Sequence, residues 1–398
     1  MNRNLLFFLL TSTLVFTACQ NNESEESSNP TVVVNRPAPT ISSKIVIYND
    51  EIDNTPIIIA GKATLITDND VPGNDNEFIE QSRWDFVVAF ERELDGQLLE
   101  FTPIRGRLPL ILEDNLGNQW NMFGEAESGP NQGQKLTSIN NGIGFWFIFG
   151  AMYPGLDIHN LTSVTPPKIE STIPDDWGVP TQNVFRSLGF DGIPAIHDPK
   201  FDQNIENQSS AELPAENDLV VGITINGESK AYPHSILDWH EVVSDVVGGV
   251  PISLTYCPLT GTAKVYDRTG QASDVFGVSG FLFNSNLIPY DRKTQSLWHQ
   301  LEGRAIFGDR LGETIPLINF VETDWSLWQQ WYPETYVLNR DTGFNRDYDS
   351  YPYGDYRTNN DHLLFTFDFD DDRIPRKERV FVVIKNGKAK AYRKDSFI

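Results

Sequence analysis

The segment GITINGESKAY, residues 222–232, consists of two short strand-like runs joined by Asn-Gly. A second copy, VVIKNGKAKAY at residues 382–392, repeats the Asn-Gly pair and the Lys-Ala-Tyr trio, with Asn386 standing 160 residues after Asn226. Asn-Gly between alternating strands is typical of a type I′ turn, because both central residues must take positive φ. Each segment is therefore predicted to be an antiparallel β-hairpin. The second hairpin either closes a sheet with earlier strands or begins a partial further repeat.

A second internal repeat has an offset of 179 residues. GEAESGPNQG at 124–133 matches GRAIFGDRLG at 303–312 in the spacing of its glycines and alanine. Three further pairs recur at the same offset: Trp146 and Trp325, Tyr153 and Tyr332, Pro154 and Pro333. Because Trp120 and Trp298 also correspond with a one-residue gap, we interpret residues 84–160 and 263–340 as two copies of one structural unit.

Strand signals dominate the rest of the chain, and helical periodicity is scarce. The strand-like runs are rich in β-branched and aromatic residues and are bounded by Gly, Asn, Asp or Pro: KIVIY, TPIIIAG, WDFVVAF, LVVGITI and RVFVVI. The clearest helix candidate is TDWSLWQQWYP, residues 323–333, with tryptophans at intervals of three and Pro333 as its stop. The predicted fold is mainly β, or α+β, with internally duplicated antiparallel units, β-hairpins and a few short helices.

Composition and charge exclude some classes of partner. Hydrophobic residues make up 39% of the chain and aromatic residues 12%, which is enough to bury a real core. The formal net charge is −24 and the sequence pI is about 4.5. A surface this acidic repels nucleic acid and anionic headgroups, so we expect no nucleic-acid partner.

The N-terminus resembles a lipoprotein export signal. MNRNLLFFLLTSTLVFTAC has Arg3 near its start, an apolar run, and small residues before Cys19. The ending FTAC is similar to the lipobox of bacterial lipoproteins, in which the cysteine carries the lipid. The following QNNESEESSNP is typical of a flexible tether. We therefore expect an exported cell-envelope protein, held at the outer membrane by a lipid on Cys19.

These observations divide the chain into five expected segments. The first two are not globular, and the next two each contain one copy of the repeat unit. The boundaries are residues 1–18 for the signal peptide, 19–40 for the lipidated cysteine and acidic tether, 41–165 for an N-terminal β-rich domain, 166–345 for a core domain with Cys257, and 346–398 for the C-terminal segment with the repeated hairpin.

Cys257, in TYCPLTGTA, is the main candidate for chemistry. If Cys19 carries lipid, Cys257 has no partner for an intrachain disulfide, and the first copy of the repeat has no cysteine. Thr255 and Thr260 place hydroxyls beside the sulfur. With His240 and His299, the thiolate would make a soft-metal ligand set for copper or zinc. The alternative is a packing role, because free cysteine is among the most buried residue types.

Several long motifs resemble the domain of unknown function 3179 family: AIHDPKF, DLVVGITINGESKAYP, HEVVSDVVGGVPISLTYCPLTGTA, GVSGFLFNSNLIPYDRKTQSLWHQ and WYPETYVL. Members are commonly exported or membrane-anchored. Many carry Cys-Pro-Leu-Cys, or a selenocysteine variant, at the position of Cys257 to Thr260, which implies redox chemistry in those relatives. This chain departs from the pattern at Thr260, so a self-contained two-cysteine cycle is excluded. The resemblance also implies that Asn284, Asn286 and Tyr290 shape the rest of a pocket around Cys257.

Two functions follow from these residues, and the sequence does not decide between an enzyme and a binding module. In the first, Cys257 is a nucleophile, redox thiol or metal ligand, with Thr255 and Thr260 as hydrogen-bond donors and His240 as base or co-ligand. In the second, the protein is a non-catalytic surface module that binds a glycan, peptide or partner protein. Nine tryptophans and the tyrosine-rich segment DYDSYPYGDY, residues 347–356, favour the second function if those tyrosines are exposed.

Overall fold

The computed structural model describes residues 44–65, 82–161, 165, 172–203, 213–270 and 275–398. The predicted signal peptide, Cys19 and the tether lie outside these residues. Among the residues described, strands predominate, and no helix is long and apolar enough to cross a membrane. The described α-helices are α1 (Trp146–Met152), α2 (His234–His240) and α3 (Trp325–Trp331). The predicted mainly β fold with a few short helices is confirmed.

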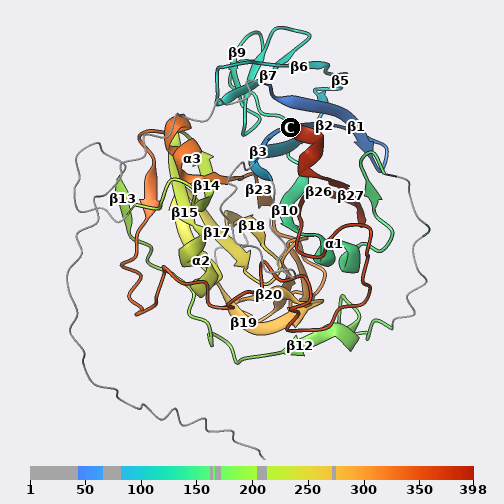
Figure 1. Ribbon diagram of the computed structural model, residues 1–398, viewed down its shortest axis with the longest axis vertical. Helices are drawn as coiled ribbons and strands as arrows, with labels where there is room; N and C mark the ends of the chain where they lie inside the picture. Colours follow the sequence, from blue (N-terminus) through green and yellow to red (C-terminus); the bar gives the residue numbers. More distant parts are fainter. Residues whose placement is uncertain (1–43, 66–81, 162–164, 166–171, 204–212, 271–274) are drawn as a thin grey trace, which may run out of the picture. The chain divides into compact units, whose positions relative to one another are not determined.

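Two sheets, which contain the hairpins β14–β15 and β26–β27 (Figure 1), share the order of four strands, and one of them has a fifth strand, β13. The first runs β13-β25-β15-β14-β24, and the second runs β10-β26-β27-β11. The strands of the first sheet are β13 (Phe201–Gln203), β14 (Leu219–Ile225), β15 (Glu228–Pro233), β24 (Val321–Asp324) and β25 (Tyr336–Leu338). Those of the second are β10 (Asn140–Phe145), β11 (Asp157–Ile158), β26 (Arg379–Lys385) and β27 (Lys388–Tyr392).

The registers of these two sheets correspond residue by residue. Leu219 pairs with Asp324 across an antiparallel ladder, and Arg379 pairs with Phe145 in the same way. The offsets of 160 and 179 found in the sequence carry the first pair onto the second. The parallel pairs β15/β25 and β27/β11 also correspond. The two sequence repeats are therefore parts of one duplicated unit.

The C-terminal hairpin completes the first copy of this unit. Asn226 and Gly227 have φ of 49° and 82°, and Asn386 and Gly387 have 50° and 75°, so both turns adopt the predicted positive φ. In chain order the first copy runs from β10 through α1 to β11, and its hairpin arrives only at the end as β26 and β27. The alternative left open by the sequence is thus resolved: the hairpin closes a sheet with earlier strands.

A second pair of sheets is also duplicated. It comprises β1-β2-β3 and β16-β17-β18-β23. Their strands are β1 (Val46–Ile52), β2 (Thr55–Leu65), β3 (Ser82–Glu91), β16 (Val242–Val247), β17 (Val250–Cys257), β18 (Thr262–Asp267) and β23 (Leu317–Ile318). In both copies an aspartate on the outer strand bonds a lysine and a tyrosine of the neighbouring hairpin.

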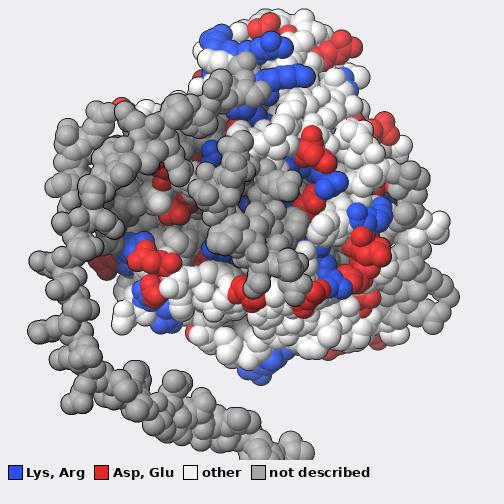
Figure 2. All heavy atoms as spheres, viewed as in Figure 1, with Lys and Arg blue, Asp and Glu red and all other residues white. Residues whose placement is uncertain are grey.

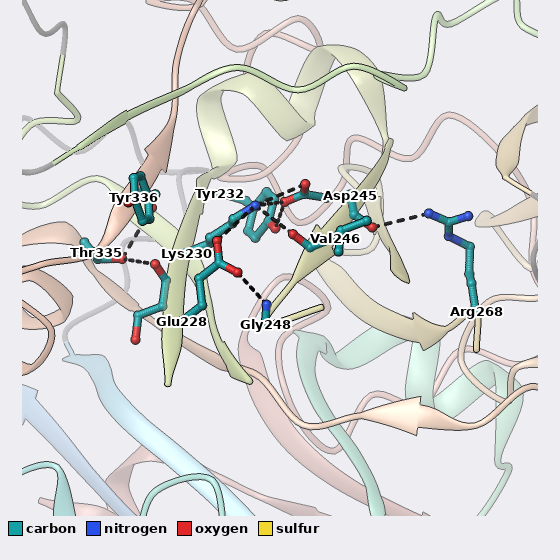
Figure 3. Close-up of polar contacts among 10 residues, drawn as sticks. Glu228, Lys230, Tyr232, Asp245, Val246, Gly248, Arg268, Thr335 and Tyr336 are labelled. Atoms are coloured by element: carbon teal, nitrogen blue, oxygen red, sulfur yellow. Dashed lines mark hydrogen bonds and ion pairs between the residues drawn. The ribbon is translucent and has the colours of Figure 1, made fainter. Parts of the chain in front are cut away.

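In the second copy, Lys230 and Tyr232 of β15 point toward Asp245 of β16 (Figure 3), with Lys230 Nζ 2.9 Å and Tyr232 Oη 2.6 Å from Asp245 Oδ2. In the first copy, Lys390 Nζ lies 2.7 Å from Asp50 Oδ1 and Tyr392 Oη donates to Asp50 Oδ2 at 2.8 Å. The same side-chain network therefore fastens each hairpin to its neighbouring sheet, and its lysine and tyrosine belong to the repeated Lys-Ala-Tyr trio.

Two meanders complete the architecture. They are β6-β7-β8-β9 and β12-β19-β20-β21-β22. The indole of Trp120 donates to Asp114 at 3.0 Å, and that of Trp298 donates to Asp291 at 3.0 Å, so these buried tryptophans occupy corresponding places. The remaining elements are β4 (Glu93–Leu94), β5 (Gln97–Leu98), β6 (Phe101–Pro103), β7 (Leu110–Asp114), β8 (Gln119–Asn121), β9 (Ala126–Ser128), β12 (Val184–Arg186), β19 (Phe276–Phe283), β20 (Asn286–Asp291), β21 (Leu297–His299), β22 (Arg304–Phe307), η1 (Thr181–Asn183) and η3 (Lys394–Phe397).

Helix α3 forms where the tryptophan spacing predicts it. Its three tryptophans are buried, and Trp328 packs so closely on β14 that a Cβ on Gly222 would lie 2.2 Å from the indole ring. Asp324, the residue before the helix, makes no side-chain capping bond, and its carboxylate pairs with Arg83 of β3 at 2.5 Å. The tryptophans of this helix are core residues.

Candidate functional site

Cys257 lies at the last position of β17, and a tight turn leads from it into β18. The Gly261 amide donates to the Cys257 carbonyl at 2.8 Å, and Gly261 has a φ of 61°. The turn residues pack against other parts of the core, and the Cys257 side chain is 1% exposed. Solvent therefore has almost no access to the sulfur in this conformation.

The surroundings of the sulfur favour the protonated thiol. Burial, with a further effect from the Glu241 carboxylate, raises the pKa of Cys257 to about 11. The Thr260 side chain and the Leu287 amide, which donates to Sγ at 3.3 Å, lower the pKa but only partly offset the burial. Because a reactive or metal-binding cysteine must be a thiolate, this conformation holds Cys257 in its inert form at neutral pH.

Thr260 and Asn286 lie together in a buried polar network behind the turn. Thr260 Oγ1 donates to Asn286 Oδ1 at 2.6 Å, and Asn286 Nδ2 donates to Gln300 Oε1 at 3.0 Å. Gln300 also donates to the carbonyls of Thr255 and Thr262, at 3.3 and 3.1 Å. The network is internally satisfied, and its obvious role is to hold the turn. The sequence did not single out Gln300.

The other predicted binding residues make separate contacts. The Thr255 hydroxyl donates to the Lys264 carbonyl at 3.2 Å, within its own sheet. Asn284 contacts Asp368, with Nδ2 3.3 Å from Oδ2. Tyr290 donates to Asp191 at 2.8 Å near the other end of β20.

The two histidines predicted as metal ligands have other partners. His240 Nδ1 lies 2.7 Å from the Pro194 carbonyl, and its Nε2 lies 2.7 Å from the Tyr348 hydroxyl. His299 packs against Phe283, with ring centroids 5.8 Å apart, and burial lowers its pKa. In the part of the chain that is described, no group of three or more His, Cys, Asp or Glu side chains could hold a metal ion.

A separate pocket of about 660 Å³ opens beside the Cys257 turn. Its volume is within the range usual for small-molecule sites, and Tyr256 and Gly261 line it on either side of the cysteine. Most of its lining is aromatic or charged. The aromatic members are Phe145, Tyr256, Tyr348 and Tyr351, and the charged or titratable members are Asp218, His234, Asp238, Arg340, Asp349, Arg357, Lys377 and Arg379.

This pocket lies between the two copies of the duplicated unit. Asn217 and Leu219 line it from the strand β14 side, and Lys377 and Arg379 line it from the strand β26 side. The offset of 160 residues carries the first two positions onto the last two. The equivalent positions are therefore neutral in one copy and cationic in the other.

Lys377 is the most unusual group of the pocket. The residue is 1% exposed, and its Nζ has no hydrogen-bond acceptor among the described residues. The ammonium instead lies over aromatic faces, 3.1 Å from the ring centroid of Tyr356 and 5.1 Å from that of Phe147. Burial, with a smaller effect from Arg376, lowers its pKa to about 7. A buried ammonium without an acceptor is costly, so this position needs an explanation beyond packing.

A buried ion-pair chain forms another wall. Arg379 pairs with Glu322, and His234 Nε2 lies 3.5 Å from the second oxygen of the same carboxylate. Burial opposes ionisation of Glu322, but Arg379 and His234 outweigh it and lower its pKa. This carboxylate therefore stays charged and fixes two pocket-lining residues, Arg379 and His234.

Two further carboxyl groups bear on the pocket: Asp238 lines it, and Glu241 lies three residues further along the chain. Burial raises the pKa of Asp238 to about 6, and it raises that of Glu241 to about 8, with Asp238 contributing to the second shift. Asp238 lies one helical turn after His234 on α2 and lines the pocket. These groups titrate near neutral pH, which is common at functional sites.

The tyrosine-rich segment covers the region between the pocket and Cys257. The Tyr351 hydroxyl donates to the Pro258 carbonyl at 3.0 Å, which ties the segment to the cysteine turn. Tyr348 and Tyr356 are buried. The expectation that this segment presents exposed tyrosines is wrong for these two, because their rings pack against the core.

One face of the molecule carries side chains of both charges. On the face seen in Figure 2, acidic and basic side chains are interspersed. The pocket, which four cationic and three acidic side chains line, is the better-defined candidate site.

A family profile described as a protein of unknown function, DUF3179, matches residues 190–397, more than half of the 398-residue chain. The chain belongs to this family. The matched region of this DUF3179 protein contains the second copy of the unit, the hairpin that closes the first, and every charged residue of the pocket. Comparison with curated proteins and with solved structures found no match.

Proposed function

We propose that this DUF3179 protein is an exported, lipid-anchored solute-binding protein, and that its ligand occupies the pocket between the two copies of the unit. The observation that carries the proposal is the buried Lys377 ammonium, which lines a 660 Å³ pocket and has no hydrogen-bond acceptor among the described residues. A ligand oxygen would satisfy that ammonium, and because the side chain is 1% exposed in this ligand-free conformation, the aromatic rings packed on it would have to move to admit the ligand. Sites at the junction of two repeated units are common among small-molecule binding proteins.

Thiol chemistry at Cys257 is the second candidate. It is supported by the position of Cys257 in the family motif and by the pocket residues Tyr256 and Gly261, which flank the turn. Burial and the raised thiol pKa both oppose it in this conformation. A binding role needs neither a reactive thiol nor a metal, so it accounts for the geometry with fewer assumptions.

A screen of small neutral and charged solutes by thermal shift tests the binding proposal. Ser235→Trp would fill the pocket, since Ser235 lines it, and Thr102→Trp on exposed β6 is the control for a bulky indole elsewhere. We expect at least one solute class to raise the melting temperature of the wild type and of Thr102→Trp, but not of Ser235→Trp. An equal shift in Ser235→Trp, or no shift with any solute, would contradict the proposal.

The anchor requires its own test, because Cys19 lies outside the described residues. Cells that express the full chain should incorporate labelled fatty acid into the protein and retain it in the membrane fraction. Cys19→Ser should abolish both the label and the membrane retention. A Cys19→Ser protein that stays in the membrane fraction would show that another feature anchors the chain.

A further inference from the structure

We infer that the ligand is a small polyhydroxylated acid, of the kind that sugar acids represent, and that its acid group binds at Lys377. This inference rests on the proposed function and adds the chemical class of the ligand. It combines three features of the pocket lining: an ammonium that has no hydrogen-bond acceptor among the described residues, a buried carboxyl group, and tyrosine rings.

The acid end is defined by Lys377. Its ammonium has three N–H donors and no acceptor among the described residues, although aromatic rings lie against it. Cation–π contact keeps the charge in place but leaves hydrogen-bond donors unused. A carboxylate would both neutralise the charge and accept hydrogen bonds from those donors.

The duplication explains why the acid binds at this side of the pocket. The position equivalent to Lys377 is Asn217, and the position equivalent to Arg379 is Leu219. A neutral ligand gains no Coulomb attraction from this difference in charge, whereas an anion is attracted to Lys377 on the β26 side, where Arg379 is already paired with Glu322. Arg357, whose guanidinium lies 4.5 Å from the Tyr351 ring centroid, adds a cation at the exposed rim.

The hydroxyl end is defined by Asp238. This buried carboxyl lines the same pocket as Lys377, and no ion pair joins the two among the described residues. A carboxylate accepts hydrogen bonds from hydroxyl groups and repels a second acid group. A ligand with hydroxyls at one end and an acid at the other therefore matches both groups, whereas a dicarboxylate does not.

Aromatic walls suit the body of such a ligand. Tyr256 and Tyr351 line the pocket, and each presents a ring face and a hydroxyl. The apolar face of a sugar ring can stack on tyrosine while its hydroxyls reach polar groups. The pocket thus has a cation that can bind the ligand's acid group, a carboxylate that can accept hydrogen bonds from its hydroxyls, and tyrosine rings on which its body can stack.

Isothermal titration of the purified full chain, below neutral pH, compares D-glucuronate with D-glucose and with acetate. Loss of one charge-assisted hydrogen bond corresponds to about a tenfold or greater loss of affinity. We expect glucuronate to bind at least about tenfold more tightly than glucose, which lacks the acid, and than acetate, which lacks the hydroxyls.

Three variants separate the possible outcomes. Lys377→Met should abolish the preference for glucuronate over glucose, Arg357→Gln at the rim should weaken it, and Lys135→Met, an exposed lysine far along the chain, should leave it unchanged. Equal affinity for glucuronate and glucose, or a preference that survives in Lys377→Met, would overturn the inference but leave solute binding intact. If none of the three probes binds although other solutes raise the melting temperature, the class is wrong and the site stands. If no solute is bound at all, the proposed function itself fails.

Discussion

Lys377 and Asn217 occupy equivalent positions in the two copies of one structural unit, and both line the same pocket. One copy thus supplies a buried cation and the other a neutral amide. Two identical copies would line the pocket between them with identical residues. A difference in charge at one equivalent pair makes the two sides of the pocket chemically distinct. The following predictions depend on this difference and on the way the C-terminal hairpin completes the first copy.

Lys377→Met should raise the stability of the ligand-free protein at neutral pH. The folded-state pKa of Lys377 is lowered to about 7, whereas the unfolded lysine stays protonated to about 10.4. Between these values the unfolded state binds more protons, so stability rises with pH and the cost of the lysine is largest below about pH 7. We expect the difference in free energy of unfolding between the variant and the wild type, measured by chemical unfolding from pH 6 to pH 10, to become smaller as the pH rises. A wild type more stable than the variant at every pH would contradict this.

Affinity for an acidic ligand should fall as pH rises above about 7. The bound state needs the protonated ammonium, so above the folded pKa the affinity should fall by about tenfold per pH unit. The charged or titratable groups around Lys377, which shape this profile, are His234, Asp238, Asp355, Arg357, Arg376 and Arg379. Titration calorimetry of glucuronate at several pH values above 7 measures this fall in affinity. In Lys377→Met the tenfold fall per pH unit should be absent.

Cys257 should resist alkylation in the folded protein. The thiol is 1% exposed and its pKa is raised to about 11, so iodoacetamide at neutral pH should modify it only after unfolding. Mass spectrometry of native and denaturant-treated samples provides the comparison. Rapid native alkylation that is lost in Cys257→Ser would make thiol chemistry the leading function instead.

Gly227→Ala and Gly387→Ala should have similar costs. Each glycine has positive φ, and an added Cβ would meet no atom within 4 Å at either turn, so the cost is conformational. We expect each variant to lower the free energy of unfolding by about 1–2 kcal/mol. Gly189→Ala, where φ is not positive and contacts are ordinary, is the control. If Gly387→Ala left the free energy of unfolding unchanged while Gly227→Ala lowered it, the terminal hairpin would not unfold together with the rest of the protein.

Asp245→Asn should destabilise the fold more than Asp50→Asn. Both carboxylates bond a lysine and a tyrosine, but the Lys230–Asp245 pair is the more deeply buried, with side-chain exposures of 9% and 9% against 22% and 17% for Lys390–Asp50. Breaking a buried pair leaves an uncompensated charge and costs about 3–5 kcal/mol, and the cost falls for a pair that is closer to solvent. Denaturant unfolding of both variants measures the difference, and equal losses would contradict it.

The sequence contained most of the information on the duplication. Asn226 and Asn386 predict the turns because few residues tolerate positive φ, and the tryptophan matches locate the helices. The relation between β1–β2 and β16–β17 was missed, because one apolar residue can replace another in a strand without changing how the strand packs, so the two sequences no longer match. Only Asp50 and Asp245 mark it, and two aspartates are too few to detect.

The candidate site was predicted less well. Cys257 was chosen for its rarity, but rarity does not report burial, and the sequence could not show that the core encloses it. Lys377 lies in a charged, irregular segment that resembles ordinary surface. Extending the 160-residue offset upstream from the hairpin would have paired Lys377 with Asn217. Even so, only the structure reveals that both positions line one pocket.

The most direct test of the central claim is a crystal structure of the protein with bound D-glucuronate. The account predicts the ligand in the pocket between the two copies, with its carboxylate within hydrogen-bonding distance of Lys377 Nζ and its hydroxyls toward Asp238. A ligand bound elsewhere, or one in this pocket with its acid group directed away from Lys377, would contradict the account.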